Sequence, residues 1–287
     1  MDHRHLPTPR HRVDERVDAW EMVVERVVET DTSVLAFGRQ NNRAVVLKVI
    51  KNFGDEWRSG RTLRAFDGRG MVRVLEHIDG AVLLERLEPG SSVAETYVNG
   101  RDGEATLALA GVIRIMSPLS PPDGTPTASD WGRDFDRYST TGNDGIPAAL
   151  LSAASRVYAR LCRSQRQVRL LHGDLHHHNV LFDDNRGWLA IDPKGVVAEL
   201  EYEVGAALRN PCENPSLFTD PVTIRKRVDC FSSELGLDST RVLSWAFSQA
   251  VLSCVWAIED GVQGKTVHQW LRLANALRSL LGDSKMA

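Results

Sequence analysis

The segment from Leu170 to Pro193, with the sequence LLHGDLHHHNVLFDDNRGWLAIDP, restricts the possible folds of this chain more than any other segment. It contains two short apolar runs, residues 180–182 and 188–191, separated by a turn rich in Asp, Asn and Gly. This pattern is typical of a β-hairpin. We therefore expect the second strand to bring Asp192 back beside Asn179, which precedes the first strand.

Asp174, Asn179 and Asp192 are the residue types that phosphoryl transfer needs. A carboxylate can orient and deprotonate an attacking hydroxyl group, while a carboxamide oxygen and a second carboxylate can hold Mg²⁺ against nucleotide phosphates. Kinase catalytic loops use an Asp base, an Asn five residues later and an Asp on the next loop. The sequence therefore predicts Asp174 as the catalytic base and Asn179 and Asp192 as magnesium ligands.

The composition indicates a soluble globular enzyme. With 42% hydrophobic and 25% charged residues, the 287-residue chain can form one large domain or two lobes around a cleft. The net charge of −3 gives no basic footprint, so we do not expect nucleic acid as a partner. No apolar run reaches the roughly 18 residues of a membrane span, and the N-terminus lacks the apolar segment of a secretory signal. The four scattered cysteines favour reduced thiols in the cytoplasm.

Lys48 lies in an apolar run, residues 45–50, that is typical of a strand. The following segment from Glu56 to Phe66 has helical spacing, with Asp55 as its N-cap. In kinases, a strand lysine pairs with an acid in the next helix and positions the nucleotide phosphates. We predict this pair to be Lys48 and Glu56. The alternatives are a solvent-facing strand lysine and a surface acid in a first helical turn.

Two further strands are expected at residues 71–75 and 81–85, and Pro89-Gly90 breaks the regular structure after them. We place a lobe boundary here. The expected organisation is an N-terminal nucleotide-binding lobe, residues 1–88, followed by a C-terminal catalytic and acceptor-binding lobe, residues 89–287.

The connection between the lobes could bind the adenine base through main-chain groups near Glu85 and Leu87. This assignment rests on position, because backbone contacts leave no side-chain signature. No GxGxxG or GxxxxGK[ST] pattern occurs where a nucleotide loop is expected. Thr32 and Ser33 are therefore our candidates for phosphate binding, with ordinary turn residues as the alternative.

Acids outnumber bases around and after Asp192. Residues 183–213 contain seven acids and three bases, and Glu199, Glu201 and Glu203 alternate within this stretch. Such a run can be a solvated face or the lining of a site for a cationic substrate. Helical spacing is found elsewhere in this half of the chain, at residues 104–116, 146–162, 221–235, 239–259 and 265–281.

The histidines His172, His176, His177 and His178 raise the question of a transition-metal site. Three consecutive histidines in an extended loop point in different directions, and no Cys or Glu lies at metal spacing nearby. We expect His172 to brace the loop by hydrogen bonds instead. A serine hydrolase is also disfavoured, because the sequence has no GxSxG elbow.

These motifs carry a resemblance to the aminoglycoside phosphotransferase family, in particular to its aminoglycoside/hydroxyurea antibiotic resistance kinase branch, which includes streptomycin 6-phosphotransferases. The most specific segments are HGDLHHHN (172–179) and WLAIDP (188–193). Three more segments look like this branch: GRGMVRVLEH (68–77), LLERLEPG (83–90) and WAIEDG (256–261). The similarity spans roughly residues 27 to 262.

The resemblance implies an α+β, protein-kinase-like, two-lobed fold, with a small β-rich N-lobe and a larger, mainly helical C-lobe. It implies ATP and Mg²⁺ as cofactors. Asp174 matches the family's base, the pair Asn179 and Asp192 its Mg²⁺ ligands, and the pair Lys48 and Glu56 its phosphate-positioning residues. The segment from Glu199 to Asn210 corresponds to the one that lines the acceptor side in this branch. The implied acceptor contacts are Glu199, Glu201, Glu203 and Asn210. The short link at residues 52–55 and the missing glycine pattern depart from the family.

We therefore expect a cytoplasmic ATP-dependent O-phosphotransferase that acts on a small, hydroxylated, cationic acceptor. A streptomycin-type aminoglycoside 6-phosphotransferase that confers antibiotic resistance is favoured. One alternative is a kinase of hydroxyurea, an amino sugar or a choline-like metabolite. Another is a nucleotide-binding pseudokinase, although such a module is expected to lose residues like Asp174 or Lys48. A protein kinase is disfavoured, because neither DFG nor APE follows Asp192.

Overall fold

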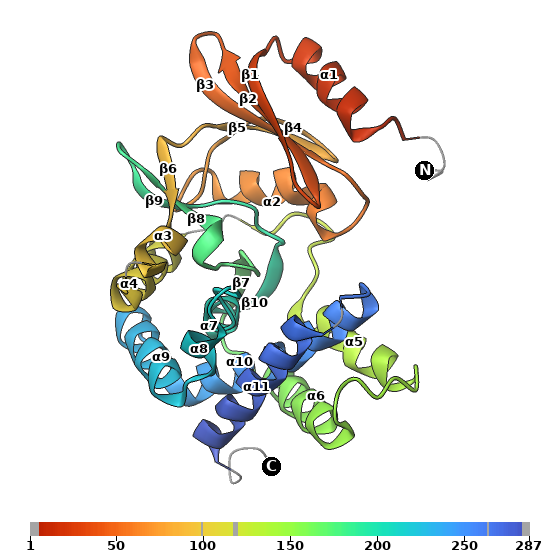
Figure 1. Cartoon of the computed structure of the whole chain (residues 1–287), viewed down its shortest axis with the longest axis vertical. Coiled ribbons are helices and arrows are strands. Elements are labelled where there is room, and N and C mark those ends of the chain that lie inside the picture. The colour runs from red at the N-terminus through yellow and green to blue at the C-terminus, as the bar shows by residue number, and fades with distance from the viewer. Residues whose placement is uncertain (1–5, 99, 117–119, 263, 283–287) are drawn as a thin grey trace.

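The computed structural model describes residues 6–98, 100–116, 120–262 and 264–282. Figure 1 shows a lobe built around a β-sheet at the top and a larger lobe of helices below it. The α+β, two-lobed, kinase-like architecture expected from the sequence is confirmed.

The N-terminal lobe is a five-stranded antiparallel sheet with the order β1-β2-β3-β5-β4. Asn41 and Asn42 form the two-residue turn between β2 and β3. Their φ angles are 47° and 64°, left-handed values that such a turn requires and that asparagine tolerates. Lys48 lies on the central strand β3, opposite Leu35 and Val82. The strands are β1 (Val23–Glu29), β2 (Ser33–Gln40), β3 (Arg43–Ile50), β4 (Val74–Ile78) and β5 (Ala81–Glu85).

Helix α1 (Pro9–Ala19) lies beside β2 and β3. It begins at Pro9, because the Thr8 hydroxyl accepts a hydrogen bond from the His11 N–H and proline is favoured in the first helical turn. Val13 is buried in the core of this lobe. Arg12 donates to the carbonyl of Ile50 at 2.6 Å. Helix α1 is therefore anchored to the end of β3, the strand that carries Lys48.

The segment after β3 forms a 3₁₀ turn, η2 (Asp55–Arg58), and then helix α2 (Ser59–Phe66). The sequence predicted one continuous helix from Glu56 to Phe66, so Glu56 lies in the 3₁₀ turn instead. Leu63 and Phe66 of α2 are buried in the same cluster as the core of the C-terminal lobe. The core of the large lobe therefore extends beneath the sheet, and it fixes α2 against the C-terminal lobe.

The C-terminal lobe combines helices with two small sheets. The five-stranded sheet ends at Glu85, and β6 pairs with β8 of the C-terminal lobe, so the expected boundary after residue 88 falls between them. The elements are β6 (Pro89–Ser92), α3 (Val93–Val98), α4 (Asp102–Ile115), α5 (Ala128–Ser139), α6 (Ala148–Arg163), β7 (Val168–Leu171), η3 (His177–Asn179), β8 (Val180–Asp183), β9 (Gly187–Ala190), β10 (Val196–Glu199), η4 (Leu200–Tyr202), α7 (Val204–Leu208), α8 (Pro215–Thr219), α9 (Pro221–Leu235), α10 (Ser239–Glu259) and α11 (Lys265–Leu281).

The predicted hairpin is present as β8 and β9, which pair antiparallel from Val180↔Ala190 to Asp183↔Gly187. Helices α9, α10 and α11 have the predicted bounds. Helix α5 was not predicted, although Thr127 and Asp130 form a capping box: the Thr127 hydroxyl accepts from the Asp130 N–H at 3.1 Å, and Asp130 accepts from the Thr127 N–H at 2.8 Å. This Thr-x-x-Asp signal was available in the sequence.

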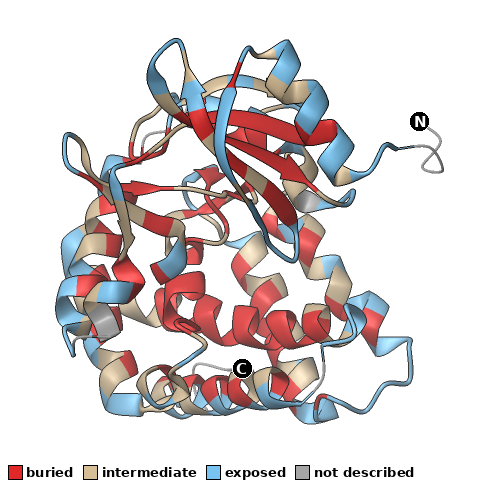
Figure 2. Ribbon diagram, turned by 45° about the horizontal axis from the view of Figure 1, so that its top comes forward, coloured by how far each residue is buried: buried red, intermediate tan, exposed pale blue. Residues whose placement is uncertain are grey.

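Helix α10 is the centre of the large lobe. It is long and apolar enough to cross a membrane, but 83% of its most apolar window is buried inside the protein, as in a core helix. Trp245 of α10 packs edge-on against Tyr158 and Tyr202, with ring centroids 5.1 and 5.0 Å away. Figure 2 shows the buried residues concentrated in the sheet and in the central helices, with exposed residues at the rim.

We predict that Leu47→Ala lowers the free energy of unfolding by about 2–5 kcal/mol, because it opens a cavity in the core that the sheet shares with helix α1. Leu47 on β3 is completely buried. The measurement is urea unfolding followed by circular dichroism. Leu107→Ala is the matched control, since Leu107 on α4 is 49% exposed. An equal effect of both substitutions would contradict the assigned core.

Candidate active site

Lys48 places a buried positive charge between the two lobes. Its side chain is 5% exposed, and its Nζ lies 3.0 Å from Oε2 of Glu56 and 2.8 Å from Oδ1 of Asp192. Burial disfavours the charged amine, but the carboxylates of Asp192 and Glu56 outweigh it and raise the pKa of Lys48. The predicted pairing of Lys48 with Glu56 is therefore present in the structure, and Lys48 is not a solvent-facing strand residue.

The β8–β9 hairpin brings Asp192 beside Asn179. The Ile191 N–H donates to the carbonyl of Asn179 at 2.9 Å, and the Asn179 side-chain NH₂ donates to the carbonyl of Asp174 at 3.0 Å. Asp192 adopts a φ of 56°, a left-handed value that is uncommon for aspartate and frequent at functional sites. The three residues singled out in the sequence thus form one connected group.

The donor atoms of Asn179 and Asp192 suit Mg²⁺. Because the Asn179 amide nitrogen is used by the carbonyl of Asp174, its carboxamide oxygen remains for a cation. Lys48 takes one carboxylate oxygen of Asp192 and leaves the other. Magnesium usually takes one or two protein carboxylates together with substrate phosphates. In the described part of the chain, no group of three or more His, Cys, Asp or Glu side chains is placed to hold a metal ion.

His172 braces the catalytic loop, as the sequence predicted. Its Nδ1 accepts a hydrogen bond from the Asp174 N–H at 3.2 Å, so its Nε2 carries the proton and donates to the carbonyl of Ile191 at 2.7 Å. Complete burial lowers the pKa of His172 and favours this neutral form. The ring therefore ties the loop that carries Asp174 to the strand that precedes Asp192.

Glu203 holds the same loop from below. Its two carboxylate oxygens accept the backbone N–H groups of His172 at 2.7 Å and of Gly173 at 3.0 Å. Burial raises the pKa of Glu203 to about 7, although these two N–H groups oppose the shift. Glu203 thus satisfies backbone donors in an irregular loop that would otherwise be buried without acceptors.

Asp174 is held by two cations. Its Oδ1 lies 3.1 Å from Nη2 of Arg209, and its Oδ2 lies 3.4 Å from Nζ of Lys194. Burial disfavours the charged carboxylate, but the charges of Lys194 and Arg209 help to hold its pKa well below the ordinary value. In the sequence, these two bases stand out only as part of the charge balance of residues 183–213. The position of Lys194, two residues after Asp192, was the available signal.

Two of the four residues expected to line the acceptor are turned inward. Glu199 is 1% exposed; it accepts from the indole N–H of Trp245 at 2.6 Å and pairs with Arg241 of α10. Glu203 is the loop brace described above. These carboxylates have internal structural partners, which corrects the expected acceptor-facing role. A count of charges along the chain could not show this, because their partners lie elsewhere in the sequence.

The other two residues of that group have different surroundings. Asn210 is 8% exposed, and its side-chain NH₂ donates to the carbonyl of Ala206 at 2.9 Å. Glu201 is half-buried in η4. An acceptor contact for Glu201 and Asn210 stays a prediction.

The expected nucleotide contacts lie in the N-terminal lobe. Thr32, in the turn between β1 and β2, lines a cavity together with Glu56. Ser33 is 3% exposed, and its hydroxyl is 3.0 Å from that of Thr30, so the structure does not bring Ser33 to this cavity. The backbone N–H of Glu85 donates to Arg73, while Leu87 follows in the connection between the lobes. The adenine contacts of Glu85 and Leu87 stay a prediction.

Two cavities meet at Lys194. The first, of about 400 Å³, is acidic: Asp31, Glu56 and Asp260 line it together with Lys194 and Thr32. Glu56 is paired with Lys48, whereas Asp31 and Asp260 have no ion-pair partner among the described residues. The carboxylates of Asp31 and Asp260 therefore give this cavity a negative charge. Lys194, which contacts Asp174, lines the same cavity.

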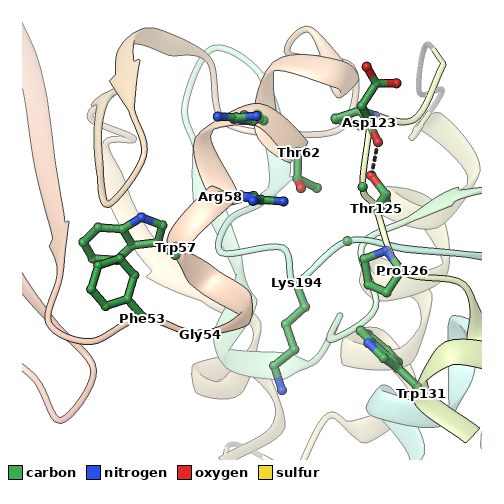
Figure 3. Close-up of a pocket in the computed structure, with 14 residues that line it drawn as sticks. Phe53, Gly54, Trp57, Arg58, Thr62, Asp123, Thr125, Pro126, Trp131 and Lys194 are labelled. Atoms are coloured by element: carbon green, nitrogen blue, oxygen red, sulfur yellow. Dashed lines mark hydrogen bonds between the residues drawn. The ribbon is translucent and has the colours of Figure 1, made fainter. Parts of the chain in front are cut away.

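The second cavity, of about 310 Å³, is aromatic and basic (Figure 3). Trp57 and Trp131 line it from opposite sides, and Arg58 and Lys194 supply positive charge. In Figure 3, the Lys194 side chain extends into the space between Gly54 and Trp131. Phe53, Gly54 and Lys194 line both cavities, so the two spaces adjoin.

Comparisons with known proteins agree with this geometry. Residues 20–261 match the family model described as aminoglycoside/hydroxyurea antibiotic resistance kinase. The chain is 33% identical to a streptomycin 3″-kinase of Klebsiella pneumoniae, covering 85% of this chain and 92% of that protein. It is 28% identical to a streptomycin 6-kinase of Streptomyces glaucescens (87% and 83% covered) and 31% identical to a hydroxyurea phosphotransferase of Kitasatospora aureofaciens (79% and 66% covered).

Solved structures show the same fold. The ternary complex of aminoglycoside phosphotransferase APH(4)-Ia with ADP and hygromycin B has a TM-score of 0.67 at 15% identity, covering 94% of this chain and 98% of that one. Choline kinase LicA from Streptococcus pneumoniae has a TM-score of 0.63 at 14% identity, covering 94% and 99%.

We predict that Glu203→Gln removes a pH dependence of stability. The folded-state pKa of Glu203 is about 7 and its ordinary value is 4.5, so the folded state binds one more proton than the unfolded state between these values. The free energy of unfolding of the natural protein should therefore fall as pH rises through this window, by on the order of 3 kcal/mol relative to the variant. Urea unfolding of both proteins across this pH range measures the difference. A difference that does not change with pH would contradict the raised pKa.

Proposed function

The chain belongs to the aminoglycoside/hydroxyurea antibiotic resistance kinase family, and on that premise we propose that it transfers the γ-phosphoryl group of ATP to a hydroxyl group of a streptomycin-type aminoglycoside. The chain is a phosphotransferase of the kinase fold. The observation that carries the choice of acceptor is the acidic cavity of Asp31 and Asp260, which opens at Lys194 beside Asp174.

ATP as the phosphoryl donor is supported by the fold and by Lys48. Structures of APH(4)-Ia contain ADP or AMP-PNP in the corresponding fold. A buried lysine that is held by Glu56 and Asp192 is the arrangement that kinases use for nucleotide phosphates. Thr32, Glu85 and Leu87 are the proposed contacts for the phosphates and the adenine base.

Asp174 is the proposed base of the reaction. Its carboxylate orients the acceptor hydroxyl and accepts its proton, while Lys48 holds the donor phosphates in place. Asn179 and Asp192 would hold Mg²⁺, which supplies neutralisation of phosphate charge when it is bound. Such sites act mainly through positioning and through fixed charges, so the hydrogen bonds of His172 and Glu203 to the loop are part of the machinery.

A cationic acceptor fits the charge of the cavity. Asp31 comes from the turn between β1 and β2, and Asp260 follows the last residue of α10, so the two carboxylates approach the cleft from different lobes. Trp57 and Trp131 line the adjoining space, and aromatic side chains are common in pockets that bind small molecules. The relatives include enzymes named for transfer to position 6 and to position 3″ of streptomycin. We take position 6 as the first to test, and we place the reaction in the cytoplasm, where it would confer resistance.

The test is an ADP-release assay with Mg²⁺-ATP and a panel of streptomycin, hygromycin B, hydroxyurea, amino sugars and choline. We expect release with streptomycin, with phosphorylation at position 6 identified by NMR of the product. Asp174→Ala should lose at least about 10³-fold of the turnover and retain ATP binding, because it lacks the base but keeps Lys48. Phosphate at position 3″, or turnover of hydroxyurea alone, would replace the acceptor assignment. Full activity of Asp174→Ala would refute the mechanism.

We predict that Asp260→Asn raises the KM for streptomycin about tenfold and leaves the KM for ATP unchanged, because it removes one charge from the acidic cavity. Steady-state kinetics with each substrate varied in turn measure this. Asp229→Asn, an exposed acid on α9, is the matched control. An unchanged KM for streptomycin in the Asp260 variant would remove the acidic cavity from acceptor binding.

A further inference from the structure

The catalytic base is covered on both sides in this structure. Arg209 contacts Oδ1 of Asp174 and Lys194 contacts Oδ2, at 3.1 and 3.4 Å. An ammonium group beside a carboxylate oxygen uses one of its lone-pair directions and makes that oxygen a weaker base for a hydroxyl proton. Release of one of the two cations would therefore make Asp174 a better acceptor of the hydroxyl proton.

The two cations differ in their freedom to move. The Arg209 side chain is 8% exposed, and its other terminal nitrogen donates to the buried side chain of Gln249 at 3.3 Å. The Lys194 side chain is 31% exposed, lines both cavities and makes the longer contact. Lysine carries a compact charge on a flexible stem. Arg209 is thus the fixed partner of Asp174, and Lys194 is the exchangeable one.

The backbone fixes Lys194 close to the residues that are proposed to hold the nucleotide phosphates. Its N–H donates to the carbonyl of His172 at 3.0 Å, and it lies two residues after Asp192, which contacts Lys48. Lys194 also lines the acidic cavity together with Thr32, the proposed phosphate contact. The backbone of Lys194 is therefore fixed between Asp174 and the proposed position of the terminal phosphate.

We propose that Lys194 exchanges partners, from Oδ2 of Asp174 to the γ-phosphate, when a nucleoside triphosphate binds. The γ-phosphate thereby uncovers the base only when a transferable group is present. A nucleoside diphosphate lacks this group and leaves Lys194 on Asp174. This inference rests on the proposed use of ATP.

The exchange is consistent with the chemistry of transfer. Oδ2 of Asp174 takes the proton of the acceptor hydroxyl, and the acceptor oxygen forms a bond to the γ-phosphorus. The bond from that phosphorus to the oxygen shared with the β-phosphate breaks, and its electron pair leaves with ADP. Lys194 offsets the negative charge of the phosphoryl group as it moves.

Isothermal titration calorimetry with Mg²⁺-AMP-PNP and Mg²⁺-ADP tests this exchange without an acceptor. We expect Lys194→Met to weaken AMP-PNP binding about tenfold and to change ADP binding less than about twofold, because only the triphosphate reaches Lys194. Lys194→Arg should keep most of the natural preference for AMP-PNP. Lys226→Met, which removes an exposed lysine of α9, should behave like the natural protein.

Equal weakening of both nucleotides by Lys194→Met, or no weakening of either, would overturn the exchange and leave Lys194 as a structural partner of Asp174. That result is distinct from a failure of the proposed function, in which the natural protein itself binds neither nucleotide. Thermal unfolding of each variant shows whether the fold is intact. If Lys194→Met does not fold, Lys194→Gln takes its place, because it also removes the charge. Selective weakening of AMP-PNP binding would again support contact with the γ-phosphate, and equal or absent weakening would count against it.

Discussion

The buried charge of Lys48 is the constraint on which the arrangement of the two lobes depends. A lysine in the middle of a five-stranded sheet is costly unless its charge is paired, and two carboxylates pair it here. Glu56 comes from the segment after the strand, and Asp192 comes from the C-terminal lobe. To pair the charge of Lys48, the sheet, the 3₁₀ turn and the β8–β9 hairpin must therefore hold fixed positions relative to one another. That requirement places Lys48, proposed to hold the donor phosphates, beside Asp192, proposed to hold Mg²⁺.

The loop that carries Asp174 depends on buried hydrogen-bond acceptors in a similar way. Its residues have no strand or helix ladder around His172 and Gly173, so their backbone N–H groups need other partners. Glu203 supplies these partners from the segment between η4 and α7, and His172 links the loop to the β9 end. The position of Asp174 is thus set by side chains that do not touch the substrate. Arg209 completes this support from the end of α7.

The two adjoining cavities of the cleft differ in charge, and Lys194 lines both of them. The side toward Asp31 and Asp260 is acidic, whereas the side toward Trp57 and Trp131 is aromatic and carries Arg58. A cationic sugar-containing acceptor can use both kinds of surface at once. Lys194, which lines both spaces, also contacts the proposed base. In the proposed reaction, the acceptor, the nucleotide phosphates and the base therefore meet at this flexible side chain.

Local spacing in the sequence was enough to predict the β8–β9 hairpin and the helices α9 to α11, because each depends on residues close together in the chain. It was also enough to propose Asp174, Asn179 and Asp192 as one group. The pairing of Lys48 with Glu56 was also accessible, since only eight residues separate them. Tertiary structure was needed to show that Glu199 and Glu203 point inward and that Lys194 and Arg209 hold Asp174. Glu199 meets Arg241 across 42 residues, and Arg209 meets Asp174 across 35. Whether a charge is solvated, paired or catalytic depends on which side chains the fold brings to it, and that information is not local.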